Sequence, residues 1–155
     1  MVKNDLSKFF ITKTEATEFA SGLSQISQLV YQTGFNLEQA LTYQFGIEKK
    51  DLLIQLIKEH EIDWQNNAEL SKYLAQMQES IVKMQTITLT LAFVPREDTL
   101  TKISDWLSLN TNGQMTIEVG VDRQIIGGAM INFKGKYCDG SIGSKFVEAA
   151  YGSNV

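Results

Sequence analysis

The chain has 155 residues, which suits one domain or two small ones, and its hydrophobic content of 43% is ordinary for a globular protein. A net charge of −4 argues against the basic surface of a nucleic-acid binder. The single cysteine, Cys138, excludes an intrachain disulfide and is consistent with a reducing compartment. No apolar run approaches the roughly 18 residues that span a bilayer, and the N-terminal stretch lacks the apolar core of a signal peptide. We therefore expect a protein that faces the cytoplasm.

The front half predicts a bundle of four or five helices, because its apolar residues recur at spacings of three and four. Asn36 and Gln39 have the spacing of a capping box, and Gly46 closes the helix that they begin. The expected helices cover residues 5–11, 14–33, 36–46, 48–60 and 67–84.

At Thr86 the pattern changes to a strict alternation of apolar and polar residues, which is typical of a half-buried strand. The elements expected after this point are a strand over residues 86–91, a helix after Pro95 with Leu100, Ile103, Trp106 and Leu107 as its apolar side, strands over 115–121 and 129–133, a short return strand at 137–138, and a last helix from Ser141 toward Tyr151. The sequence therefore predicts an α+β protein. An N-terminal helical bundle over residues 1–85 precedes a small β-α-β-β-α domain over residues 86–155.

Catalytic and metal-binding groupings are not apparent. His60 is the only histidine and lies between two glutamates at an expected helix end, where a solvated side chain is favoured over a metal site or a proton shuttle. Cys138 has no histidine or second cysteine to pair with, so we expect a small buried core residue. The glycines of the back half lack the Gly-Lys-Ser/Thr ending of a phosphate loop. We therefore expect no catalysis, no metal and no cofactor.

Aromatic and methionine side chains on the expected helices are predicted mostly to fill the bundle core. They are Phe19, Tyr31, Tyr43, Phe45, Tyr73, Met77 and Met84. Short bundles also often expose an apolar groove that accepts a partner helix. The candidate groove residues are Phe19, Leu23, Ile26, Tyr73 and Met77. The sequence alone does not decide whether these side chains fill the core or line a groove.

The most informative stretch covers residues 121–146, where two short strand patterns follow a polar turn and a glycine pair. Asp122 belongs to the polar turn. Gly127 and Gly128 let the backbone bend or take a positive φ. Ser141, which follows Asp139-Gly140 at the end of the return strand, can cap a helix.

This ordered pattern resembles the C-terminal signature of the delta subunit of F-type ATP synthases, whose mitochondrial counterpart is the oligomycin-sensitivity-conferring protein. The matching residues are Asp122, Ile125, Ile126, Gly127, Gly128, Asp139, Gly140, Ser141 and Ile142. The run Ala92-Phe93-Val94-Pro95 is also similar to the family's exit from a strand before its helix. Two positions depart from the family, since Arg123 stands where proline is usual and Gly143 where arginine is frequent. The front half is shorter than the family's usual bundle.

The resemblance implies a non-catalytic subunit in the peripheral stalk, or stator, of a proton-translocating ATP synthase. In that family the helical part binds the N-terminal segment of an alpha subunit, and the C-terminal part binds the end of the b-subunit stalk. The subunit then lies on the cytoplasmic side of the cell membrane and reaches the membrane only through its partners. The positions expected to shape the stalk-binding part are Asp122, Ile126, Gly127, Gly128, Asp139, Gly140 and Ser141.

Two alternatives stay open from the residues. One is an unrelated interaction scaffold with a helix-binding groove, and the other is a small enzyme or ligand-binding domain that uses the glycine turns.

Overall fold

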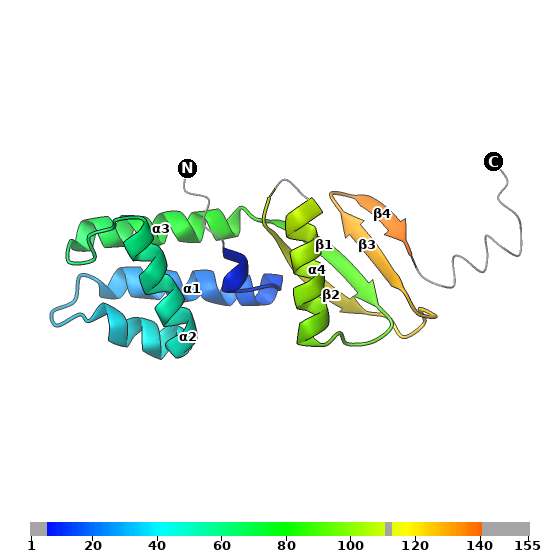
Figure 1. The fold of residues 1–155 in the computed structure, drawn as a ribbon, viewed down its shortest axis with the longest axis horizontal. Coiled ribbons are helices and arrows are strands. Elements are labelled where there is room, and N and C mark those ends of the chain that lie inside the picture. The colour runs from blue at the N-terminus through cyan, green and yellow to red at the C-terminus, as the bar shows by residue number, and fades with distance from the viewer. Residues whose placement is uncertain (1–5, 111–112, 141–155) are drawn as a thin grey trace, which may run out of the picture. The chain divides into compact units, whose positions relative to one another are not determined.

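The computed structural model describes residues 6–110 and 113–140 (Figure 1). Its elements are a 3-10 helix η1 (Leu6–Lys8), α1 (Lys13–Leu29), α2 (Leu37–Glu59), α3 (Asn67–Val82), β1 (Gln85–Leu91), α4 (Glu97–Asn110), β2 (Met115–Val121), β3 (Ala129–Phe133) and β4 (Lys136–Asp139). The fold is α+β, with helices first and a mixed sheet after them, as predicted. The last helix expected from Ser141 lies outside the described residues.

The contacts divide the chain into two compact units. The helical unit comprises Met1–Phe10 and Thr14–Met84, and the sheet unit comprises Ile11–Lys13 and Gln85–Val155.

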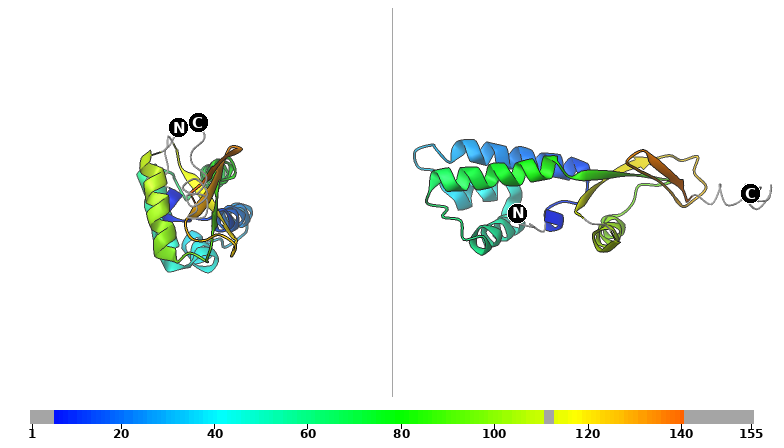
Figure 2. Two further views of the ribbon diagram at one scale, coloured as in Figure 1. Left: turned by 90° about the vertical axis from the view of Figure 1, so that its right-hand side faces the viewer. Right: turned by 90° about the horizontal axis from the view of Figure 1, so that it is seen from above.

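The helical unit has one apolar core to which each of its helices contributes. Phe19 of α1 lies near its centre, with ring centroids 5.0 Å from Phe9, 5.7 Å from Phe10 and 4.6 Å from Phe45. Full burial of each such side chain stabilises the fold by roughly 1.5–3 kcal/mol. α1 and α3 run side by side (Figures 1 and 2), and the hydroxyls of Ser27 and Ser71 are 2.9 Å apart between them.

A kink at Gly46 divides α2 into two helical segments. The backbone there has φ 80° and ψ 174°, a conformation that is essentially restricted to glycine. The predicted end of one helix at Gly46 and start of another after it are thereby confirmed. The capping box is partly confirmed, since the Asn36 side chain accepts a hydrogen bond from the backbone N–H of Gln39 at 3.0 Å.

The sheet has the strand order β2-β1-β3-β4. β1 pairs parallel with β2 along seven residues, β3 is antiparallel to β1, and β4 is antiparallel to β3. A parallel pair needs a crossover connection, which α4 supplies on one face of the sheet (Figure 2). The core between α4 and the sheet comprises Ile87, Leu89, Leu91, Leu100, Ile103, Leu107, Ile117, Val119, Ala129 and Ile131, joined by Ile11.

The residues just before and at the start of α1 belong to the sheet unit. Thr12 forms an isolated parallel bridge with Ile117, whose N–H donates a hydrogen bond to the carbonyl of Ile11 at 3.0 Å. Lys13 Nζ lies 3.6 Å from Glu118 Oε1. The sequence did not indicate this pairing, because three residues are too few to show a strand period.

Several burial predictions were wrong. Cys138 is exposed, because β4 is the edge strand and all four of its residues face solvent. Trp106 is exposed because the buried side of α4 runs through Ser104 and Leu107, so the indole lies off that stripe. Tyr31 and Tyr43, placed with the core aromatics, are also exposed.

Replacing Gly46 tests the kink. Gly46→Ala places a side chain at a φ of 80° and should lower the free energy of unfolding by about 1–3 kcal/mol in urea titrations. Gly113→Ala is the matched control, because its φ is not in the positive range and its Cβ would meet open space. Equal stability of the two variants would show that the kink carries no strain.

A second prediction concerns Gly22 of α1. A Cβ there would lie 2.5 Å from Cε1 of Phe45, so Gly22→Ala overpacks the contact with a ring that already packs on Phe19. The cost of about 1–3 kcal/mol should exceed the gain of up to about 1 kcal/mol from removing a helical glycine. A double-mutant cycle with Phe45→Leu should show coupling, whereas additive losses would contradict the contact.

Candidate partner-binding surfaces

The five residues predicted as a partner groove are all buried in the core of the helical unit: Phe19, Leu23, Ile26, Tyr73 and Met77. The structure brings these five side chains together, but it does so inside the bundle, where they pack between the helices. They therefore offer no surface to a partner in this conformation. They belong to the clearest apolar patterns of the helices, and these apolar faces pack against one another to form the bundle.

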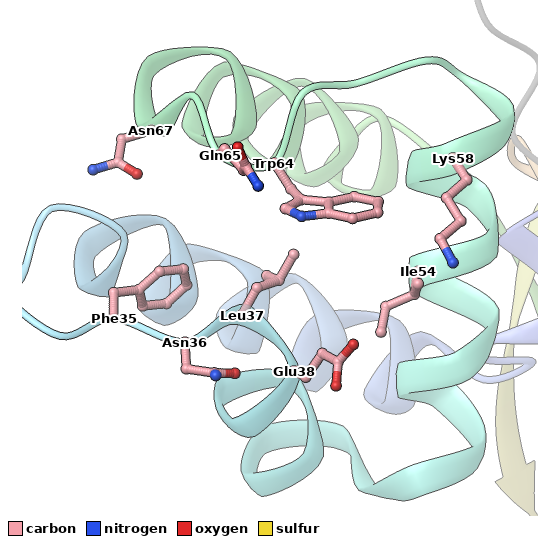
Figure 3. Close-up of a pocket in the computed structure, with 9 residues that line it drawn as sticks. All are labelled: Phe35, Asn36, Leu37, Glu38, Ile54, Lys58, Trp64, Gln65 and Asn67. Carbon is pink, nitrogen blue, oxygen red and sulfur yellow. The ribbon is translucent and has the colours of Figure 1, made fainter.

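The helical unit instead has a surface pocket of about 410 Å³ (Figure 3). It lies between the loop before α2, the second half of α2 and the loop before α3. Its lining residues are Phe35, Asn36, Leu37, Glu38, Ile54, Lys58, Trp64, Gln65 and Asn67. Figure 3 shows Leu37 and Ile54 directed toward the hollow beside the Trp64 indole. Four of the nine lining residues are apolar and five are polar or charged, so the walls combine both kinds of surface.

Trp64 is the largest side chain at the rim of this pocket. It is 40% exposed, and Nζ of Lys58 lies 5.6 Å from its ring centroid, within the range of a cation–π contact. A partly exposed tryptophan beside a hollow is the kind of side chain that dominates binding energy at protein interfaces.

Local hydrogen bonds hold the loop that carries Trp64. The Asp63 carboxylate accepts from the N–H of Gln65 at 3.0 Å, and Asn66 caps α3 by accepting from the N–H groups of Ala68 and Glu69. Sequence reasoning treated this stretch only as a helix break and missed Trp64. The signal was a tryptophan in a polar turn, where no core stripe accounts for it.

His60 caps the C-terminus of α2 and is half-buried. Its Nδ1 lies 2.7 Å from the hydroxyl of Tyr73, and the two rings meet edge to face at 5.6 Å. The histidine is therefore at a helix end as expected, but it is less solvated than expected because it contacts α3. In residues 6–110 and 113–140, no cluster of three or more His, Cys, Asp or Glu is arranged to hold a metal ion.

In the sheet unit, the polar turn after β2 is held by Asp122. Its carboxylate accepts from the N–H of Gln124 at 2.9 Å, and its carbonyl accepts from the N–H of Ile125 at 3.2 Å. Gly127 and Gly128 follow with φ of 77° and 81°, so both use the left-handed conformation that glycine permits.

The second part of the family motif, Asp139 and Gly140, lies at the end of the edge strand β4. Asp139 pairs with Met130, and the N–H of Gly140 donates to the carbonyl of Ala129 at 2.9 Å. A Cβ at Gly140 would lie 3.1 Å from that same oxygen, so a larger residue would crowd the turn. Ser141 lies outside the described residues.

Four large apolar side chains of the sheet unit remain exposed near the ends of β1 and β2. We name Phe93, Val94, Val121 and Ile126 the sheet-end patch. Two of them belong to the run Ala92–Pro95, and Ile126 belongs to the glycine-pair motif, so both segments that carry the family resemblance contribute to it.

A family model described as "ATP synthase delta (OSCP) subunit" matches residues 2–150. The chain belongs to this family. The match includes both the helical unit and the sheet unit, whereas the resemblance read from the sequence was clear only from residue 86 onward. No individual curated protein sequence matches the chain.

A delta (OSCP) subunit is a non-catalytic component of the peripheral stalk of an F-type ATP synthase, and this assignment holds for the present chain. It replaces the two alternatives that the residues had left open. Among the described residues, no helix is long and apolar enough to cross a membrane.

The exposure of Trp64 can be tested by fluorescence. In a Trp106→Phe variant, Trp64 is the only tryptophan, since the chain has two. Its emission should be quenched strongly by acrylamide in the folded protein because the indole is at the surface. Weak quenching that increases only on unfolding would place the indole in the core instead.

Proposed function

We propose that this subunit links the catalytic head of the ATP synthase to the b-subunit stalk. The helical unit binds the N-terminal segment of an alpha subunit, and the sheet unit binds the end of the stalk. The observation that carries the proposal is the family match across both units. Once one unit is attached to its partner, binding of the second unit is effectively intramolecular and therefore stronger. Two such contacts can hold the head against the torque of the rotor, and no catalytic group is needed.

The pocket beside Trp64 supports the assignment of the helical unit. Its walls of Phe35, Leu37, Ile54 and Trp64 suit the apolar side chains of an amphipathic segment, and Lys58 adds a charge at the rim. We place the contact with the alpha subunit there, in place of the groove expected from buried core residues.

We place the boundary between the two functional parts next to Gln85, where β1 begins. The division of the contacts between Met84 and Gln85 supports this boundary. In the sheet unit, Asp122, Gly127, Gly128, Asp139 and Gly140 shape the loops and the edge. As part of the stalk, the subunit is held on the cytoplasmic side of the cell membrane by its partners.

Affinity capture of the tagged full chain from its native cell, after gentle solubilisation, tests the proposal. Alpha, beta and b subunits should be retrieved in near-stoichiometric amounts. Retrieval of none of them would refute the linking role.

Binding of the isolated alpha N-terminal segment tests the pocket. Trp64→Ala should weaken this binding by about tenfold or more, since truncating an anchoring tryptophan often costs 2 kcal/mol or more. Tyr31→Ala is the control, because Tyr31 is an exposed aromatic of the same unit that does not line the pocket. Equal losses from both variants would argue against the pocket as the binding site.

A further inference from the structure

We propose that Ile11–Lys13 is a releasable strap that restrains the motion of the two units relative to each other. These three residues belong to the sheet unit, although the chain on both sides of them belongs to the helical unit. Closed on β2, the strap gives the units a second connection besides the one between Met84 and Gln85. The part that this restraint plays under torque rests on the proposed function.

Three kinds of contact attach the strap to the sheet unit. The carbonyl of Ile11 accepts a hydrogen bond from the N–H of Ile117 at 3.0 Å, and Thr12 forms a parallel bridge with Ile117. The Ile11 side chain packs against the core cluster that contains Ile117. Lys13 Nζ lies 3.6 Å from Glu118 Oε1. Backbone, apolar and ionic contacts therefore all hold the segment on β2.

No linker residues separate the strap from the helical unit. Phe10, the residue before it, is buried in the core of the helical unit. After it, α1 begins at Lys13 itself, and Ala16 is again buried in that core. Consecutive Cα atoms are about 3.8 Å apart, so the chain has little slack at either end of the strap. The strap therefore transmits a displacement of one unit to the other instead of absorbing it.

The other connection is equally short. Met84 packs against the helical core, and Gln85, the next residue, is the first of β1 and pairs with Met115. A single connection of this kind lets one unit rotate about the backbone dihedrals of one or two residues. With two connections, the units turn freely only about the line through the two crossing points. The closed strap therefore removes most of the rotational freedom that a single connection leaves.

The strap is weaker than the rest of the sheet. β1 and β2 are paired along seven residues, whereas the strap contributes an isolated bridge. The side chains of Lys13 and Glu118 are 54% and 51% exposed, and an ion pair at the surface contributes little to stability. Segments with few buried contacts open locally more often than the whole fold unfolds. The strap is thus a part of the chain that can release while both units stay folded.

Amide hydrogen exchange of the wild-type chain tests whether the strap is closed in solution. The N–H of Ile117 donates to the strap, and because successive N–H groups along a strand alternate in direction, the N–H of Val119 faces the same edge. No described strand pairs with that edge at Val119. The amide of Ile117 should exchange about tenfold more slowly than that of Val119, or more slowly still. Equal rates would overturn the proposal.

Distances between two spin labels, measured by double electron–electron resonance, test the restraint itself. Cys138 is the single cysteine and is exposed in the sheet unit, and Tyr43→Cys adds a site that is 92% exposed in the helical unit. The variant Ile11→Ser/Glu118→Lys removes the apolar anchor and sets two lysines against each other. It should speed exchange at Ile117 and widen the distribution of label distances by about twofold, since one connection then limits the rotation.

Two further variants serve as controls. Glu79→Lys makes the same change of charge in an exposed ion pair with Lys83 of the helical unit and should leave the distribution unchanged. Lys13→Glu/Glu118→Lys restores an ion pair with its charges exchanged and should give a distribution as narrow as that of the wild type.

Unchanged exchange at Ile117 in the strap variant, or faster exchange without a wider distribution, would show that these contacts do not restrain the units. Both experiments use the chain alone. Their failure would therefore leave the linking function standing, and failure to retrieve ATP synthase subunits would leave the strap standing.

Discussion

The parallel pairing of β1 with β2 is the constraint on which the sheet unit depends. Seven consecutive residues of β1 face residues thirty positions later, from Gln85↔Met115 to Leu91↔Val121. Such a pairing cannot be closed by a hairpin, so the chain between the strands must cross one face, and α4 does so with Leu100, Ile103 and Leu107 inward. The same pairing sets both carboxyl ends at one edge of the sheet. The apolar core and the exposed sheet-end patch therefore have the same origin.

The helical unit depends on a different kind of contact. Phe19 joins the start of the chain to α2 through Phe9 and Phe45, and the kink at Gly46 follows directly after Phe45. The pocket lies where the second segment of α2 meets the two loops that flank α2. Phe35, Leu37 and Ile54 line the pocket and also pack against the bundle core, whereas Trp64 lines the pocket without belonging to that core. Trp64 is therefore the apolar lining residue whose replacement should disturb the core least.

A stalk subunit acts by holding partners, so its functional residues should be exposed apolar and charged side chains on well-supported loops. Trp64 and Ile126 both fit this description. Trp64 lies in a loop held by Asp63 and Asn66, and Ile126 lies between the Asp122 turn and a glycine pair. In each case short-range hydrogen bonds shape the backbone and leave the apolar side chain at the surface.

The sequence by itself determined most of the elements and the family. Helical spacing placed the core stripe of α1, alternation placed β1 and β2, and Asn36 and Gly46 marked helix limits, because each of these signals is local. The ordered residues from Asp122 to Ile142 pointed to the ATP synthase delta family for the same reason.

Only the tertiary structure decided which apolar side chains are covered. Phe19 and Met77 could have lined a groove, but they meet in the core, whereas Trp106 and Cys138 are left exposed. The addition of Ile11–Lys13 to the sheet unit also depends on pairing across the chain. Periodicity shows that a face is apolar, but long-range contacts decide what covers it.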